Sequence, residues 1–290
     1  MDINIPDVKF DKLLRTVSKV FGGLLEPLSI KRRAIALAEA KIIDARARGD
    51  AAIIATENQA KIAIRKAQLL AAYPELEYAS EEYRQLAERA AHRFIFQETR
   101  RQSNIEQVTV IAANELVTAE SMSDAEVSED WINNFFNECQ DIGESEMQLL
   151  WGKILAGEVT RPGSFSRKTI ATVKVMSQDD AEAFRIFYNH TWIINSGLRC
   201  AIQKFIRPGQ IISLAESENL LSKHGVGYGK LAVLSQLGLI FNEFNAKLAI
   251  DHSTTLQYHN NHHQLESCDN IMYLSGPLLT WSGFELAKII

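Results

Sequence analysis

A long stretch without proline constrains this chain more than any other feature of its sequence. Between Leu28 and Ala72 there is no proline and a single glycine, Gly49. The stretch consists mainly of Ala, Ile, Lys, Arg, Glu and Gln, most of which are strong helix formers. A continuous helix over these residues would be about 65 Å long at roughly 1.5 Å per residue. Such a helix needs a partner, because helices in proteins gain most of their stability from packing.

The isoleucines of this stretch indicate how it packs. Ile42, Ile53 and Ile64 are eleven residues apart, a spacing typical of straight helices or a slight right-handed supercoil. Alanines between them allow close helix approach. The pattern predicts a homo-oligomer of side-by-side helices with these isoleucines in the interface. A helical hairpin within one chain, closed at Tyr73-Pro74, is an equally good alternative and is compatible with assembly.

Residues 8–25 are predicted to form an amphipathic helix before this stretch. One side carries Leu, Val and Phe, and the other carries mainly basic residues. A basic amphipathic helix can make a peripheral contact with an anionic membrane. It can also pack on a neighbouring helix, and the pattern favours packing because most such stripes belong to the core. The basic residues are Lys9, Lys12, Arg15 and Lys19.

A second long helix is expected after Ser80, which can serve as its N-cap. Its apolar stripe begins with Tyr83, Leu86, Ala90 and Phe94. Residues 119–130 are mainly polar and acidic and contain no aromatic or branched aliphatic residue apart from Val127, which is typical of a linker. The sequence therefore predicts an assembly region over residues 1–118, a linker over 119–130, a helical domain over 131–205 and a further module over 206–290.

The helical domain has clear start signals. A helix is expected over Trp131–Cys139. A second follows Ser145, with a buried face of Met147, Leu150, Trp151, Ile154 and Leu155. Ser166 is predicted to cap a helix from Arg167, and Ser177 one that runs to Ile194.

The last module is expected to be a winged-helix-like α+β module. Helices over 214–223 and 229–237 flank a glycine-rich turn at 224–228, and short strands are expected over 239–244, 247–251, 254–259 and 271–274. Thr280 is predicted to cap a closing helix. The fold class is therefore mainly α, with long N-terminal helices, coiled or in a hairpin, a helical domain and this module.

No catalytic motif is found, and the sequence predicts a non-enzymatic protein. Four histidines, at 252, 259, 262 and 263, lie close together. They lack carboxylates or cysteines at a ligand spacing, apart from Cys268. No metal or cofactor site is therefore predicted. The cysteines Cys139, Cys200 and Cys268 suggest no disulfide framework and are expected to be free, buried thiols. We expect a cytoplasmic protein, at most peripheral to a membrane, since no secretory signal or spanning segment is found.

Charge argues against broad nucleic-acid binding. The first 115 residues carry a net charge of +2 and the remainder −7, whereas phosphate contacts require clustered cations. The helix after His224 and its turn has Lys230 as its one cation, and recognition helices usually carry several polar or basic readers. We therefore treat His224 and Lys230 as candidates for partner binding, with protein docking favoured over DNA.

Three motifs resemble a known bacterial family. The first, Phe21-Gly-Gly-Leu-Leu-Glu-Pro27, leads into Ile30-Lys-Arg-Arg-Ala34. The most specific runs from Glu146-Met-Gln-Leu-Leu-Trp151 to Pro162-Gly-Ser-Phe-Ser166. The third is Leu279-Thr-Trp-Ser-Gly-Phe-Glu-Leu286. In this order they resemble the family called domain of unknown function 2806, over nearly the whole chain. The middle motif is also similar to one in the abortive-infection alpha family.

The resemblance implies a bacterial protein of phage defence and supplies no catalytic residues. The hypothesis is a non-enzymatic, oligomeric interaction or effector protein of the abortive-infection type. A partner groove at Arg161, Ser164 and Ser166 is a candidate, although all three fit turn and cap positions. The alternative function is a DNA-binding regulator that uses the winged-helix-like module.

Overall fold

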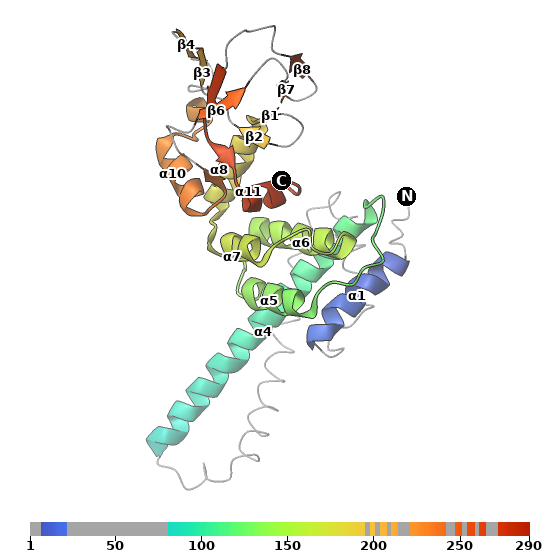
Figure 1. Ribbon diagram of the computed structural model, residues 1–290. Coiled ribbons are helices and arrows are strands. Elements are labelled where there is room, and N and C mark those ends of the chain that lie inside the picture. Colours follow the sequence, from blue (N-terminus) through green and yellow to red (C-terminus); the bar gives the residue numbers. More distant parts are fainter. Residues whose placement is uncertain are drawn as a thin grey trace, which may run out of the picture. The chain divides into compact units, whose positions relative to one another are not determined.

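The chain forms two compact units, Met1–Thr160 and Arg161–Ile290. The structure, a computed structural model, describes residues 7–21, 81–194, 198–200, 204–207, 210–213, 221–241, 247–250, 254–258, 261–264 and 272–290. Over these residues the chain is mainly helical, as the sequence predicts (Figure 1).

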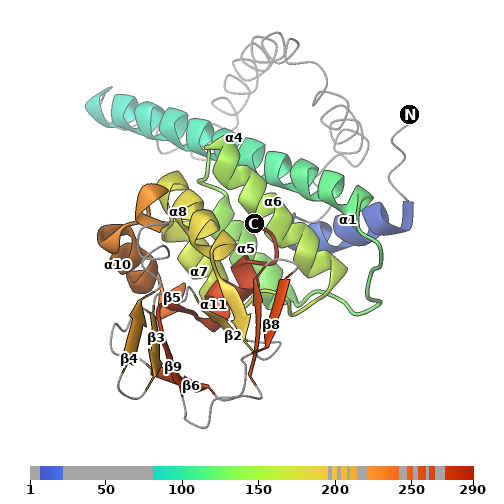
Figure 2. The same ribbon diagram turned by 90° about the horizontal axis from the view of Figure 1, so that it is seen from above.

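The first unit is built from helices. Its described elements are α1 (Asp7–Phe21), α4 (Glu81–Val117), α5 (Glu129–Cys139) and α6 (Ser145–Thr160). α6 packs along the second half of α4, and α1 contacts α4, α5 and α6. The first half of α4 extends past these helices in both views (Figures 1 and 2).

Aromatic residues of α5 and α6 fill the core of the first unit. The ring of Phe135 stacks on Trp131 at 5.1 Å and meets Trp151 edge-on at 5.2 Å. Trp151 is fully buried, as predicted for the face of α6, and its indole Nε1 has no hydrogen-bond partner among the described residues. Cys139 is a buried free thiol, also as predicted, and burial raises its pKa.

A glycine sets the distance between α4 and α6. A Cβ on Gly152 would lie 2.3 Å from Cγ2 and 2.7 Å from Cβ of Ile111, and 3.3 Å from the backbone nitrogen of Ala112. Glycine inside a helix costs roughly 1 kcal/mol relative to alanine. Here it lets the two helices approach closely, which explains a glycine directly after Trp151 in the most specific motif.

Helix α1 buries its apolar side within the first unit. Phe10, Leu13 and Val17 are 4 %, 0 % and 0 % exposed. At the far end of the helix, Lys19 Nζ lies 2.9 Å from Oε2 of Glu126, and this ion pair lowers the pKa of Glu126. The stripe thus packs on neighbouring helices, the interpretation that the pattern favours. A membrane contact by residues 8–25 stays a prediction.

The basic side chains of α1 bind the C-terminal end of α4 and the segment after it. Lys9 Nζ donates to the carbonyl oxygens of Leu116, at 3.3 Å, and of Ala119. Lys12 Nζ donates to the carbonyl oxygen of Ser123 at 2.6 Å, and burial lowers its pKa. The last carbonyls of a helix lack intrahelical partners and carry partial negative charge. Lys9 satisfies one of these carbonyls, that of Leu116, whereas Lys12 holds the segment that follows the helix.

Residues 119–130, predicted as a linker between domains, belong to the first unit. The Ser123 amide donates to the carbonyl oxygen of Thr160 at 2.9 Å, and Val127 is 2 % exposed. The division between the units therefore falls after Thr160 rather than at the predicted linker. The physical reason is that α4 packs on α6, which joins residues on both sides of this segment.

The described helices of the second unit are α7 (Arg167–Val175), α8 (Gln178–Asn189), α10 (Tyr228–Gln236) and α11 (Trp281–Leu286). All but α10 begin at a capping side chain. Ser166 caps α7, and Thr280 caps α11 by accepting from the Gly283 amide at 3.1 Å. Ser177 and Asp180 form a capping box at the start of α8. These three caps confirm the predictions.

Short antiparallel strands complete the second unit. One described sheet has the order β5-β10-β2-β1-β7-β8 and the other β4-β3-β9-β6. Register pairs include Ile193 with Arg199 and Phe205 with Leu274. The strands are β1 (Trp192–Ile194), β2 (Leu198–Cys200), β3 (Lys204–Arg207), β4 (Gln210–Ser213), β5 (Ile240–Phe241), β6 (Lys247–Ile250), β7 (Thr255–Tyr258), β8 (Asn261–Gln264), β9 (Met272–Ser275) and β10 (Leu278–Leu279).

The second unit has more strand than the sequence predicts. β5, β6, β7 and β9 lie within or next to the predicted strands, whereas β1 to β4, β8 and β10 were not expected. The helix predicted to reach Ile194 ends at Asn189, and β1 follows. The reason is the run of β-branched and aromatic residues at 191–194, which favours a strand. The winged-helix interpretation stays a prediction.

Several predicted features lie outside the described residues. These are the helix over 28–72 with its turn at Tyr73-Pro74, most of the helix over 214–223, and His252, His259 and Cys268. The interface candidates Ile42, Ile53 and Ile64 also lie there.

The close approach at Gly152 predicts that Gly152→Ala destabilises the first unit by about 1–3 kcal/mol, because an added methyl group overpacks the contact with Ile111. Helix propensity alone would predict a gain of roughly 1 kcal/mol. Urea unfolding of the full chain measures the difference. Gly143→Ala is the matched control, since a Cβ there meets nothing within 4 Å. A Gly152→Ala chain as stable as wild type would contradict this packing.

Candidate interaction site

Helix α4 carries one apolar stripe from end to end. Tyr83, Phe94, Ile105 and Leu116 follow each other at eleven-residue spacing, which is about three turns of an α-helix and keeps them on one face. Ile105 and Leu116 are buried in the first unit, at 4 % and 0 % exposed. Tyr83 and Phe94 are 57 % and 61 % exposed. Among the described residues, helices of the first unit cover the second half of the stripe, whereas the side chains of Tyr83 and Phe94 in the first half are more than half exposed.

We call residues 81–97 of α4 the stem. Two further large apolar side chains of the stem are exposed, Leu86 at 56 % and Phe96 at 64 %. Leu86 flanks the stripe, whereas Phe96 lies on another side of the helix. Ala87 and Ala90 lie on the stripe between the aromatic residues. A single exposed apolar residue is ordinary, but a continuous apolar face indicates an interaction site. The sequence predicted this stripe, and the structure shows that the stem half is not core.

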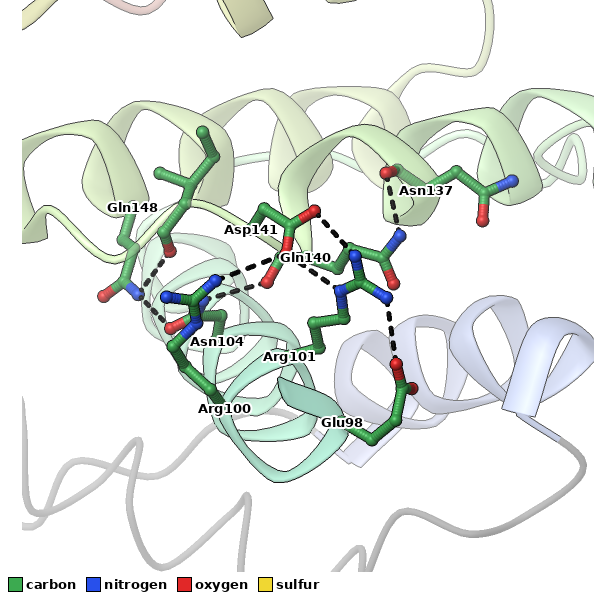
Figure 3. A network of polar contacts seen from close by, with 9 residues as sticks. Glu98, Arg100, Arg101, Asn104, Asn137, Gln140, Asp141 and Gln148 are labelled. Carbon is green, nitrogen blue, oxygen red and sulfur yellow. Dashed lines mark hydrogen bonds and ion pairs between the residues drawn. The ribbon is translucent and has the colours of Figure 1, made fainter. Parts of the chain in front are cut away.

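An ionic cluster holds α4 where the stem ends (Figure 3). Arg101 donates to both carboxylate oxygens of Asp141, at 2.8 and 3.2 Å, and to Glu98 at 2.9 Å. These hydrogen bonds, first those to Asp141, raise the pKa of Arg101. Arg100 lies 3.7 Å from the same aspartate. Asp141 thus ties the loop after α5 to α4.

Buried amides complete this junction (Figure 3). Asn104 donates to the carbonyl oxygen of Gln140 at 2.9 Å, and its own side-chain oxygen accepts from Gln148 at 3.2 Å. Gln148 also donates to the carbonyl oxygen of Ile142 at 2.9 Å. Satisfied buried networks of this kind rigidify a core. We call α5, α6 and residues 98–117 of α4 the base, from which the stem extends.

The predicted partner groove at 161–166 is a turn and a helix cap. Ser164 donates through Oγ to the carbonyl oxygen of Arg161 at 2.7 Å, and its amide donates to the same oxygen at 3.2 Å. Gly163 has a φ of +83°, which favours glycine. Ser166 Oγ accepts from the Thr169 amide at 3.3 Å. These contacts account for Ser164 and Ser166 as structural residues.

A buried glutamate joins two of the sequence motifs. Glu285 is 3 % exposed, and its Oε2 accepts from the Ser166 amide at 2.7 Å and from Thr169 Oγ1 at 2.5 Å. A carboxylate is favourable at this position because the N-terminus of α7 carries partial positive charge. Sequence reasoning gave Glu285 no role. Its presence in a motif was the one available signal.

A second glycine brings the closing motif near the rest of the second unit. A Cβ on Gly283 would lie 2.1 Å from the carbonyl oxygen of Leu239. Thr280 donates to the carbonyl oxygen of Gly238, and its amide donates to that of Leu239 at 3.0 Å. The motif therefore serves packing and capping. Trp281 of the same motif is 73 % exposed.

The remaining candidates lie in the second unit. The ring of His224 lies 5.1 Å from that of His190, whose Nδ1 is 2.7 Å from the carbonyl oxygen of Ile186. Lys230 Nζ lies 3.5 Å from Oδ2 of Asp179. The structure brings neither His224 nor Lys230 together with Arg161 in a shared network among the described contacts.

Two further kinds of site were sought in the part of the chain that the structure describes. No group of three or more His, Cys, Asp or Glu side chains is placed to hold a metal ion there. Within the same residues, no helix has both the length and the apolar character needed to cross a membrane.

The capping role of Glu285 predicts that Glu285→Ala lowers the free energy of unfolding by about 1–3 kcal/mol, because it leaves the Ser166 amide and the Thr169 hydroxyl without their buried acceptor. Urea unfolding of the full chain checks this. Glu182→Ala is the control, since Glu182 pairs with Arg185 on the surface and such pairs contribute little. Equal losses in the two variants would contradict the role.

Comparison with known proteins yields one match. A family model described as protein of unknown function (DUF2806) matches residues 88–290. The matched residues include both Ser166 and Glu285, whose hydrogen bond joins α7 and α11, and the match begins within the stem. No curated protein and no solved structure is significantly similar to the chain.

Proposed function

Because the chain belongs to the DUF2806 family, whose function is unknown, we propose its function from its own residues: it is a non-enzymatic protein that acts by self-association. The observation that carries this proposal is the exposed half of the α4 stripe. Tyr83 and Phe94 belong to the same stripe as two fully packed residues, yet more than half of each side chain is exposed. A helix face of this kind requires a partner to become buried.

The way the base holds α4 supports the proposal. Asp141 and the buried amides of Asn104 and Gln148 hold the helix at the point where the stem leaves the base. A held helix loses little conformational freedom when a partner binds, and this favours association. In this proposal Ile42, Ile53 and Ile64 provide further contacts of the same eleven-residue period.

A setting in bacterial phage defence forms part of the proposal. Its support is the resemblance of the motif at 146–166 to the abortive-infection alpha family. Within that motif Gly152 allows the close approach of two helices and Ser166 caps α7. An effector without its own chemistry would then work through its assembly.

The alternative of a DNA-binding regulator has less support. The helix that would enter a DNA groove, α10, carries Lys230 and no other Lys or Arg. The Lys230 ammonium group lies 3.5 Å from a carboxylate oxygen of Asp179. Sequence-specific recognition of DNA requires cationic or polar side chains on such a helix that are available to bind base edges.

The proposal predicts that the full chain is an oligomer and that Phe94→Glu reduces its solution mass toward the 32.6 kDa of one chain. Phe94 is 61 % exposed, so a charge there disturbs association rather than the base. Light scattering at increasing protein concentration measures the mass. Val175→Glu is the control, because Val175 is an exposed apolar residue outside α4. A monomeric wild-type chain would contradict self-association, and equal masses of the two variants would exclude the stem.

The defence setting predicts that bacteria expressing the chain form fewer phage plaques than bacteria expressing Phe94→Glu. The reason is that the effector acts through the assembly which the substitution removes. Plaque counts on a panel of phages, with Val175→Glu expressed at the same level, provide the measurement. If wild type and Phe94→Glu gave equal counts for every phage, the defence role would be refuted.

A further inference from the structure

Three arginines and a phenylalanine share one side of α4. Arg93, Phe96 and Arg100 follow Arg89 after four, seven and eleven residues, and these spacings place all four on the same side of an α-helix. All four side chains are exposed, that of Phe96 to 64 %. We call these four residues the arginine face. It extends over about 16 Å at 1.5 Å per residue and lies on a different side of α4 from the stripe.

The arginines of this face are not placed to stabilise the helix itself. Arg89 and Arg93 are four residues apart, a spacing at which like charges repel. No acidic residue lies three or four positions from Arg89, Arg93 or Arg100. By contrast, Arg101 and Arg185 each pair with a glutamate three positions before them. Residues that break a local rule in this way are expected at functional sites.

The acidic residues nearest to the arginine face lie on other sides of α4 or bind a different arginine. Glu88 and Glu98 project from other sides of the helix, and Glu98 accepts from Arg101. Asp141 accepts from Arg101 through both carboxylate oxygens and lies 3.7 Å from Arg100. The face is therefore locally cationic, although the whole chain carries a net charge of −5.

We propose that the arginine face binds single-stranded nucleic acid, RNA or DNA. Guanidinium groups bind phosphate through paired hydrogen bonds, and α4 contains arginine but no lysine. An exposed aromatic ring among cations allows an unpaired base to stack, as in proteins that bind single strands without sequence preference. Phe96 lies between Arg93 and Arg100 and takes this position. The inference goes beyond self-association and does not depend on it.

The composition of the face favours a single strand over other anionic partners. Binding in a membrane surface requires a wide apolar side next to the cations, whereas Phe96 is the one apolar residue among the four. A duplex keeps its bases stacked on each other, so that it would leave Phe96 without a role. An acidic peptide would need the arginines alone. Phosphates together with unpaired bases match all four residues.

Fluorescence anisotropy of labelled oligouridylate and oligothymidylate tests the inference with the full chain. We expect both strands to bind, because phosphates and base faces occur in both. A higher affinity for one of them identifies the strand that the face prefers. Phe96→Ala is expected to weaken binding about fivefold or more, which is the loss that corresponds to one stacked base.

Arginine variants show whether the phosphates contact this face. Arg93→Gln is expected to make the slope of log affinity against log salt concentration less negative by about 0.7, the contribution of one phosphate on a single strand. Glutamine preserves the helix because its helix propensity is similar to that of arginine. Arg185→Gln is the matched control, since it removes the same charge from an exposed side chain of the second unit. It should leave the slope unchanged.

Four other outcomes overturn the inference. Wild-type protein that binds neither strand at low salt refutes it. Equal effects of Arg93→Gln and Arg185→Gln mean that the arginine face is not the site. A duplex that binds as tightly as the single strands, with no loss in Phe96→Ala, shows contacts to phosphates alone. Binding to vesicles that contain phosphatidylserine, without binding to the strands, identifies a membrane as the partner.

Discussion

The contact between α4 and α6 at Gly152 determines how the first unit is built. With no side chain at Gly152, α6 lies directly against Ile111 and the adjacent backbone. This approach buries the second half of α4, and residues 119–130 then return along the unit to α5. Lys9 of α1 binds a carbonyl group in the last turn of the same helix, and Lys12 binds one in the segment after it. Each of these contacts depends on α4 keeping its place on α6.

The same helix has a different role before residue 98. Its stripe continues with unchanged spacing, but no described part of the base covers it. The buried and exposed parts of α4 meet near Arg100 and Arg101, where Asp141 of the loop after α5 forms ion pairs with both arginines. One helix is therefore part of a core at one end and presents an apolar face at the other. This combination is the observation on which the proposed self-association rests.

Local signals in the sequence predicted more of the structure than long-range ones. Ser166, Ser177 and Thr280 were recognisable as caps because a cap depends on neighbouring residues alone. The stripe of α4 was also visible, but its exposure depends on which helices lie beside it, and the spacing of Phe94 resembles that of Ile105. Glu285 and Ser166 are far apart in the sequence, so no periodicity could pair them. Strands β1 to β4 were missed because they are short and carry little alternation.

Hydrogen exchange of α4 as a function of protein concentration tests the central claim most directly. Amides of residues 104–117 lie in the base and should exchange slowly at every concentration. Amides of residues 82–97 should become protected as the concentration rises and copies associate, and Phe94→Glu should abolish that gain. Protection of 82–97 that is the same in dilute and concentrated wild-type protein would show that the stem needs no second copy, and would contradict the account.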